Sequence, residues 1–365
     1  MEKLFFLIAF LTALGLILSL QPSTTNVTPQ HALSLIVDSR IELLAVIQML
    51  SDYDKRFGLI SQHDMPYKHD VIEYFHPYKD HAVINWFNRM SDAGFVFDAP
   101  PHAMLHLSAP PSLKIQVPFP DYLKARAGGE KQLKRFVEAL RNFAHETQFM
   151  VFFKAHQGFF SQMVAKAYRN LTRIDIVEEL ERYYGMKQHS YTIILAPLFH
   201  QGGFGAKIRR ADGRFDVYAI LGPTGTLEGI PIFGSPSWFR SIVWHEFSHS
   251  FVNPVTERFR QEIAKYSFLY DPIAEVMKNQ GYGDWESCVN EHIIRAIEIR
   301  RTYREIGKEA GDRALQREKS QGFIYIEALS DRLRDYEAQR DRYPTFVDFY
   351  HELIKVFKEL SQKDH

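Results

Sequence analysis

The chain of 365 residues contains a single cysteine, Cys288. One thiol excludes an internal disulfide framework, a cysteine-based zinc ribbon and a CxxC redox pair. Any chemistry of this protein therefore depends on histidine, carboxylate or hydroxyl side chains.

Net charge is also missing, because 44 Lys and Arg residues balance 44 Asp and Glu residues. A chain without a positive surplus has no field that attracts the phosphates of nucleic acid. We therefore expect no DNA or RNA partner. The hydrophobic content of 45% is enough for one large core or two smaller ones, which excludes a disordered chain.

The only long apolar run lies at the N-terminus. Residues 4–20 follow a short charged start and precede a polar run that ends at Asn26, the pattern of an export signal. The run is long for a signal and slightly short for a spanning helix, so residues 1–26 are predicted to be a signal peptide or a retained membrane anchor. We expect the remainder to be exported, and to be periplasmic, extracellular or anchored facing outside.

Periodicity predicts an α+β fold, with a mostly helical N-terminal region at 27–187 and a second domain at 188–365. Two short β-branched runs, 191–195 and 216–221, predict a small sheet of hairpins with glycine-rich corners. The proline-rich stretch 99–120 is expected to be a connection. Helices are expected at 35–50, 133–144, 177–184, 237–252, 257–270, 284–306, 323–340 and 345–361.

One motif carries chemistry, the H-E-x-x-H string from His245 to His249. It lies in an expected helix that Ser237 can cap and that Asn253-Pro254 would end. Residues four apart share one face of a helix, so the imidazoles of His245 and His249 can hold one ion. This arrangement suits Zn²⁺ with an open fourth position, beside which Glu246 can act as the general base.

A third ligand is needed, and the metzincin pattern does not supply it, because its later positions here are Val252 and Val255. Downstream, a helix capped by Asp284 carries the dipeptide Asn290-Glu291. These residues resemble the gluzincin branch of zincin metallopeptidases, whose third ligand is a Glu in an Asn-Glu dipeptide on a following helix. The resemblance implies a zincin-like lobe at 188–365 with Glu291 as the third ligand.

Other third ligands remain open, with His292 ahead of Glu257 and Glu262. The chain also departs from the gluzincin pattern, because Arg295 stands four residues after Glu291, where those enzymes tend to carry an acidic residue. Arg295 can instead hold the Glu291 carboxylate by a charge-assisted hydrogen bond. The string 245–254 is also similar to one in a group of exported bacterial proteins of unknown function. This resemblance extends over most of residues 35–350, but it implies no substrate.

Attack on a carbonyl builds negative charge that needs a donor. Tyr325 is the first candidate for this role, with Arg295, Tyr282 and His200 as the others. Residues 202–205 are expected to form a rim loop, and the strand at 217–221 is a candidate for pairing with an extended peptide.

The predicted function is an exported zinc metallopeptidase that acts on a peptide or protein substrate. Two alternatives stay open: a non-catalytic envelope binding protein on a zincin scaffold, and a zinc amidase acting on cell-wall peptides. Residues 4–20 would anchor any of these to a membrane if they are retained.

Overall fold

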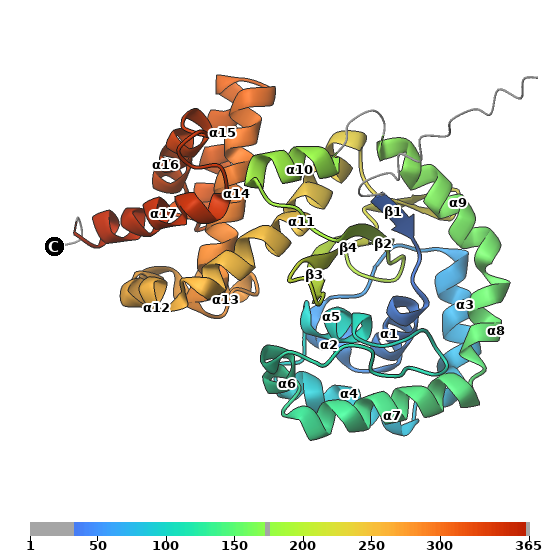
Figure 1. Cartoon of the computed structure of the whole chain (residues 1–365). Coiled ribbons are helices and arrows are strands. Elements are labelled where there is room, and N and C mark those ends of the chain that lie inside the picture. The colour runs from blue at the N-terminus through green and yellow to red at the C-terminus, as the bar shows by residue number, and fades with distance from the viewer. Residues whose placement is uncertain (1–32, 172–175, 363–365) are drawn as a thin grey trace, which may run out of the picture. The chain divides into compact units, whose positions relative to one another are not determined.

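The computed structural model describes residues 33–171 and 176–362. The predicted signal or anchor at 1–26 lies outside these residues. Within the described part of the chain, no helix is both long enough and apolar enough to cross a membrane. Helices surround two small sheets, which confirms the α+β class (Figure 1).

The main sheet has four strands in the order β1-β2-β4-β3. They are β1 (Leu33–Ile36), β2 (Ser190–Leu195), β3 (Gly202–Arg209) and β4 (Phe215–Gly222). β1, β2 and β4 run parallel, and β3 pairs antiparallel with β4. The sheet is therefore mixed, and only its β3–β4 part is the hairpin expected. A separate hairpin joins β5 (Gly225–Leu227) to β6 (Ile230–Ile232).

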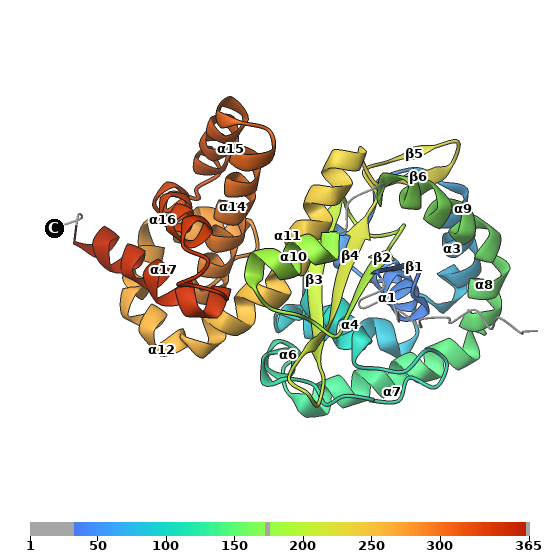
Figure 2. The ribbon, with the colours of Figure 1, turned by 45° about the horizontal axis from the view of Figure 1, so that its top comes forward.

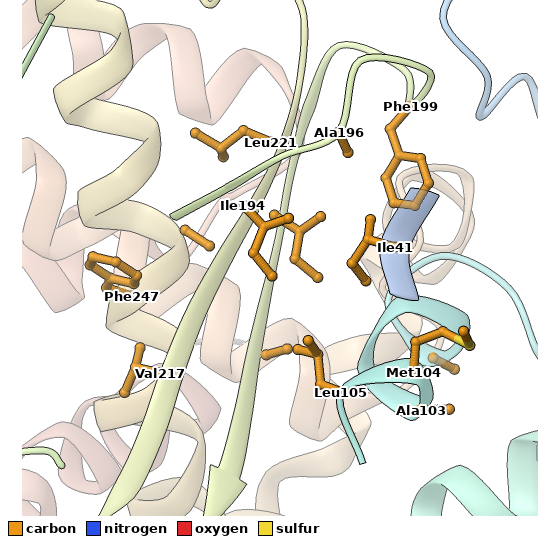
Figure 3. Close-up of a cluster of buried hydrophobic side chains, with 14 of the residues drawn as sticks. Ile41, Ala103, Met104, Leu105, Ile194, Ala196, Phe199, Val217, Leu221 and Phe247 are labelled. Carbon is orange, nitrogen blue, oxygen red and sulfur yellow. The ribbon is translucent and has the colours of Figure 1, made fainter. Parts of the chain in front are cut away.

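Helices cover the sheet from two sides. Figure 3 shows Phe247 of α11 (Pro236–Arg258) on one side of the strands. Ile41 of α1 (Ser39–Leu50) and Met104 of α5 (Ala99–Leu105) lie on the other side. Every residue of β4 except Tyr218 is buried, as expected for a strand with both faces covered. Each fully buried large apolar side chain, such as that of Ile220 or Leu221, contributes about 1.5–3 kcal/mol to folding.

Helices of the N-terminal part precede β2. They are α1 (Ser39–Leu50), α2 (Tyr53–Phe57), α3 (Pro66–Phe75), η1 (His76–Tyr78), α4 (Ala82–Asp92), α5 (Ala99–Leu105), α6 (Asp121–Arg126), α7 (Glu130–Glu146), α8 (Phe149–Ala155), α9 (Gln157–Tyr168), η2 (Arg169–Leu171) and α10 (Ile176–Tyr184).

Helices of the C-terminal part follow β6. They are α11, α12 (Arg260–Ile263), η3 (Ala264–Ile273), α13 (Ala274–Asn279), α14 (Trp285–Glu305), α15 (Lys308–Ser320), α16 (Ile326–Ala338) and α17 (Phe346–Ser361). α11 contacts β3 and β4 as well as α14, so it connects the sheet to the C-terminal helices (Figures 1 and 2).

Some sequence predictions about the elements were wrong. Leu35 and Ile36 belong to strand β1, because they pair with Ile193 and Ile194 of β2. The proline-rich stretch contains the helix α5, which two prolines open at positions where a missing N–H costs nothing. The helix expected at 257–270 is divided at Phe259, where the backbone leaves helical geometry and the ring stacks on Tyr350.

Pro254 does not end its helix, contrary to expectation, since α11 continues to Arg258. Proline cannot donate to the carbonyl four residues earlier, which is that of Ser250. The side chain of Gln188 supplies the missing donor, because its Nε2 lies 3.3 Å from the Ser250 oxygen. Its Oε1 accepts from the backbone N–H of Phe215 at 3.0 Å. Gln188 therefore ties α11 to the start of β4.

The described residues fall within one compact unit, 31–365. β1 comes from the region expected to be helical, yet it pairs with β2, which begins at Ser190. The main sheet therefore contains strands from both sides of the expected boundary between 187 and 188.

Candidate metal centre

Helix α11 presents the H-E-x-x-H residues to a cavity beside β3. Ser235, rather than the expected Ser237, caps this helix, since its Oγ accepts from the N–H of Trp238 at 3.3 Å. Phe247 is buried and contacts the ring of Tyr191 on β2, with centroids 5.3 Å apart. Because Phe247 faces the sheet, His245 and His249 lie on another side of the helix, at the cavity.

Helix α14 brings the third predicted ligand to the two histidines. Asp284 opens this helix with a capping box, in which its side chain accepts from the N–H of Ser287. One ligand atom each from His245, His249 and Glu291 lie within 4.8 Å of one another. The Nε2 atoms of the histidines are 3.3 and 3.6 Å from the Glu291 oxygens. The three residues could therefore hold one metal ion.

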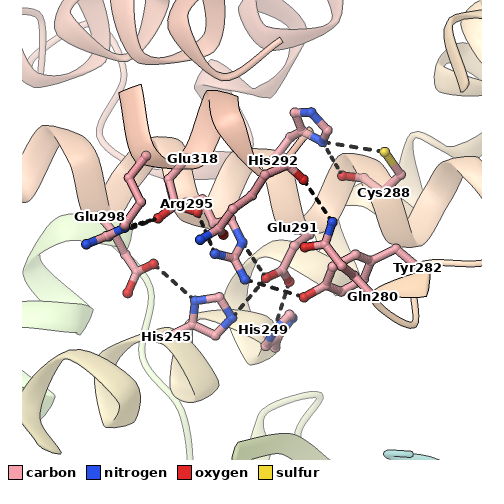
Figure 4. Close-up of polar contacts among 12 residues, drawn as sticks. His245, His249, Gln280, Tyr282, Cys288, Glu291, His292, Arg295, Glu298 and Glu318 are labelled. Carbon is pink, nitrogen blue, oxygen red and sulfur yellow. Dashed lines mark hydrogen bonds and ion pairs between the residues drawn. The ribbon is translucent and has the colours of Figure 1, made fainter. Parts of the chain in front are cut away.

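The other ring nitrogen of each histidine has its own partner. Nδ1 of His245 lies 3.1 Å from Oε2 of Glu298 (Figure 4). Nδ1 of His249 lies 3.2 Å from Oδ1 of Asn253. Such outer contacts fix the tautomer and the orientation of a ligating imidazole. Each Nε2 is left to face Glu291, which is the orientation that a shared ion requires.

Glu298 has a role that sequence reasoning missed. It lies seven residues after Glu291 and therefore on the same face of α14. The sequence pattern that was considered places an acidic residue four positions after Glu291, where this chain has Arg295. The same helix face continues to Glu298, so a spacing of seven is the signal that points to it.

Arg295 makes the contact proposed from the sequence. Its Nε donates to Oε1 of Glu291 at 2.8 Å, and its Nη1 donates to Glu318 at 2.6 Å. The guanidinium also lies over the ring of Phe323, with Cζ 4.4 Å from the centroid. Arg295 is thus held in place and orients Glu291, so it is not a free donor for an oxyanion.

The charged groups of this cluster shift one another's pKa values. Burial lowers the pKa of His245, but the carboxylates of Glu291 and Glu298 outweigh it and raise that pKa well above its ordinary value. Burial raises the pKa of Glu291, but His245 and Arg295 outweigh it and hold that pKa well below its ordinary range. Burial lowers the pKa of His249 to about 4. The site therefore keeps Glu291 ionised beside the two imidazoles, which favours a bound cation.

Glu246 lies beside the cluster, packed against the backbone of β3. Its side chain is only 4% exposed. A Cβ placed on Gly203 would lie 2.6 Å from its Oε1, so only glycine permits this approach. Burial raises the pKa of Glu246 to about 7, where a carboxyl can both take and give a proton near neutral pH.

The alternative ligands lie away from this cluster. His292 is buried, and its Nδ1 lies 2.9 Å from the backbone oxygen of Cys288, on the far side of α14 (Figure 4). Glu257 is exposed beside Arg260, and Glu262 pairs with His351. None of the three belongs to the group of residues that could hold a metal.

Tyr325, the first oxyanion candidate, does not line the cavity, which corrects that prediction. Its hydroxyl is buried and donates to the backbone oxygen of Leu269 at 2.7 Å. Tyr282 and His200 do line the cavity, on different walls. Nη2 of Arg295 lies 3.5 Å from the Tyr282 hydroxyl.

The chain matches one protein family over most of its length. A family model described as Domain of unknown function (DUF4932) matches residues 33–356. The chain belongs to that family. No curated protein and no solved structure matches it. The matched residues include both the sheet and the candidate metal ligands, but the family description assigns no activity to either.

The cavity around the cluster has a volume of about 750 Å³. One part of its wall is apolar and includes Leu59, Phe204, Trp238 and Ile242. Other parts are polar and belong to α14, to the turn before it and to the segment after α4. The size falls within the range of small-molecule and peptide sites.

Strand β3 is the open edge of the sheet at this cavity. The expectation for residues 217–221 was wrong, because β4 has β2 and β3 on its two sides. Residues 202–205 are part of β3 rather than a rim loop. The Lys207 oxygen accepts from Nε2 of His102, away from β4. Since backbone groups alternate along a strand, those of Gly203 and Gly205 point outward as well, toward the cavity.

Proposed function

We propose that this protein is an exported, zinc-dependent metallopeptidase of the gluzincin type. One observation carries the proposal: two helices bring His245, His249 and Glu291 within 4.8 Å, while Glu246 lies beside them without joining the cluster. Two imidazoles and one carboxylate with an open position form a catalytic zinc set rather than a closed structural one. The export segment predicted at 1–26 supports a location outside the cytoplasm.

The chemistry of the three candidate ligands fits zinc. Both Nε2 atoms and the Glu291 carboxylate are ligands that zinc prefers, and Glu298, Asn253 and Arg295 orient them. Zinc in this position would supply a Lewis acid and lower the pKa of water toward neutrality.

Glu246 would then serve as the general base. It adjoins the ligand His245 in sequence, and β3 confines its carboxylate. In the proposed reaction Glu246 takes one proton from the attacking water and delivers it to the leaving amine. A carboxyl with a pKa of about 7 suits both transfers.

Tyr282 is the donor best placed for the oxyanion. It lines the cavity, and its hydroxyl lies near the guanidinium of Arg295. Burial raises the pKa of Tyr282 well above its ordinary value, so the hydroxyl keeps its proton at neutral pH. His200 is second, because it lines the cavity on the β3 side and its buried Nδ1 has no partner among the described residues.

The edge of β3 supports a peptide as the substrate. The outward N–H and C=O groups of Gly203 and Gly205 can pair with an extended chain laid along the strand. Such pairing would bring a peptide bond past Glu246 and His249, which contact these same glycines. The edge strand favours a peptide over a compact small molecule.

The first prediction tests the metal and the base together. The purified protein should bind about one zinc per chain, and chelation should abolish cleavage of a peptide library that includes cell-wall peptides. Glu246→Gln should reduce turnover by about 10²- to 10⁴-fold, because it removes the proton acceptor. Zinc content should stay unchanged and the melting temperature should not fall, since neither a ligand nor core volume is lost.

Two further variants serve as controls. Glu291→Ala should lower zinc affinity strongly, whereas His292→Ala should not, because His292 lies outside the cluster. Near wild-type turnover in Glu246→Gln would exclude the general-base role. A zinc-loaded wild type that cleaves nothing would favour the envelope binding protein, and cleavage of cell-wall peptides alone would favour the amidase.

A further inference from the structure

A second cavity lies beside α11 and shares no lining residue with the metal cavity. Its volume is about 340 Å³, and α10, α11, α14 and α16 contribute to its wall. Trp244, the residue directly before His245, is part of this wall. The rings of Trp244 and Tyr183 meet edge to face, with centroids 6.3 Å apart.

Two buried hydrogen-bond donors on this wall have no acceptor. Trp244 is 2% exposed and Tyr183 is 9% exposed. Neither Nε1 of Trp244 nor the hydroxyl of Tyr183 has a partner among the described residues. A buried donor left without an acceptor costs about 1–3 kcal/mol, so native proteins rarely keep one without a reason.

The carboxylates on the wall do not accept from these two donors, and each of them pairs with arginine instead. The ion pairs join Glu179 to Arg240 at 2.6 Å, Glu305 to Arg240 at 3.0 Å and to Arg301 at 2.9 Å, and Glu337 to Arg300 at 2.8 Å and to Arg304. Two of these guanidinium groups also lie over the aromatic rings, that of Arg301 over Trp244 and that of Arg304 over Tyr183.

Positive charge remains after these pairs are formed. Arg340 donates to the backbone oxygens of Tyr183 and Pro344, and no described carboxylate lies within ion-pair distance of it. Arg182 lies 3.8 Å from Glu178, but both side chains are 70% exposed. An exposed ion pair of this kind contributes little stabilising free energy. The wall and its immediate partners thus hold six guanidinium groups against four carboxylates.

We propose that this cavity binds a small organic anion. Its carboxylate or phosphate oxygens accept hydrogen bonds from Trp244 and Tyr183, and its charge is balanced by Arg340. Unpaired donors together with surplus guanidinium groups select an acceptor-rich, negatively charged ligand. The volume suits a small molecule. The proposal does not depend on peptidase activity.

Calorimetric titration of the full chain tests this site. Inorganic phosphate and succinate represent the two anion chemistries, and sodium chloride at equal ionic strength controls for screening. Tyr183→Phe should weaken binding of the preferred anion about tenfold, because it removes one hydrogen bond to a charged acceptor. Without the anion, Tyr183→Phe should be as stable as wild type or more stable, since it removes an unpaired hydroxyl. Arg340→Gln should also weaken binding.

Tyr184→Phe is the matched control, because Tyr184 is also buried but does not line the cavity. Anions also coordinate zinc, so the titration is repeated with His249→Ala, in which the cavity is intact and binding should persist. Equal affinity in wild type, Tyr183→Phe and Arg340→Gln would overturn the proposal. Loss of binding in His249→Ala would also overturn it, as would no binding of either anion at about 10 mM, where even a millimolar Kd gives a signal.

Discussion

Gly203 matters because of the side chain it lacks. A Cβ at this position would lie 2.6 Å from Oε1 and 2.8 Å from Cγ of Glu246. Such distances are too short for real contacts, so any other residue must move Glu246 or the edge of β3. The proposed base is therefore positioned by the absence of an atom on the neighbouring strand.

We predict that Gly203→Ala reduces kcat by about 10²-fold, the typical cost of displacing a catalytic group by about 1 Å. Zinc content should be unchanged, because none of the three ligands is altered. Gly225→Ala is the control, since a Cβ there makes only ordinary contacts, 3.6 Å from Ile232. Steady-state kinetics and metal analysis check both variants. Full activity in Gly203→Ala would show that the Glu246 position is not critical.

Glu42 is a fully buried carboxyl in α1. Its Oε2 accepts from the Tyr67 hydroxyl at 2.7 Å, while its Oε1 has no partner among the described residues. Burial raises its pKa from 4.5 to about 8. The folded protein therefore keeps this proton at neutral pH, whereas the unfolded chain releases it.

This pKa makes stability depend on pH. A raised carboxyl pKa favours folding fully below about pH 4.5, and the benefit is lost as the pH rises to about 8. The shift corresponds to about 5 kcal/mol as an order of magnitude. Glu42→Gln should therefore gain several kcal/mol relative to wild type between pH 5 and pH 8. Chemical denaturation at both values checks this, and a constant difference between the two proteins would contradict it.

Helix α14 shows how one element assembles a site. Glu291, Arg295 and Glu298 follow one another at spacings of four and three, which places them on a single face. The first can hold a metal, the second orients the first, and the third orients His245. The helical period alone therefore places one candidate ligand and two orienting residues on the same face of α14.

Gln188 is the tie between α11 and the sheet. It satisfies the Ser250 carbonyl that Pro254 leaves without a helical donor, and it accepts from Phe215. Gln188→Met should destabilise the protein by about 1–3 kcal/mol per unpaired buried group. Pro254→Ala in the Gln188→Met background should recover part of this loss, because an N–H at 254 can bond to Ser250. Urea denaturation of the four proteins checks the coupling, and additive effects would contradict it.

Helix α15 was not predicted because its pattern is faint. It has few apolar residues among many charges, and only Gly311, Leu315 and Glu318 are buried. A Cβ at Gly311 would lie 2.2 Å from the ring of Tyr303, so this helix packs closely on α14. Close backbone packing of this kind leaves little hydrophobic periodicity in the sequence.

The whole molecule depends on contacts across the expected domain boundary. β1 pairs with β2, while α1 and α5 cover the side of the sheet opposite Phe247 (Figure 3). A fragment of residues 188–365 would expose that apolar face. We predict that it unfolds without a cooperative transition, whereas residues 27–365 melt in one step. Calorimetry of both checks this, and a cooperative transition in the fragment would show that 188–365 is an independent domain.

The sequence by itself determined the parts of the site that depend on local geometry. The spacing of His245, Glu246 and His249 follows from one helix, and the capping residue Asp284 predicts the start of the next. The resemblance to gluzincins singled out Glu291, and the structure brings it to the two histidines. The helix features need only the period of a helix and the chemistry of the side chains, whereas the choice of Glu291 rested on the resemblance.

Tertiary structure alone decided the rest. Whether Tyr282 or Tyr325 reaches the cavity depends on packing around α14 and not on spacing. β3 rather than β4 is the open edge, because β2 pairs in parallel with β4, and β1 in turn pairs with β2 across more than 150 residues. Such pairing leaves no local signal, since each partner strand is short and the contacts that select it are distant in the chain.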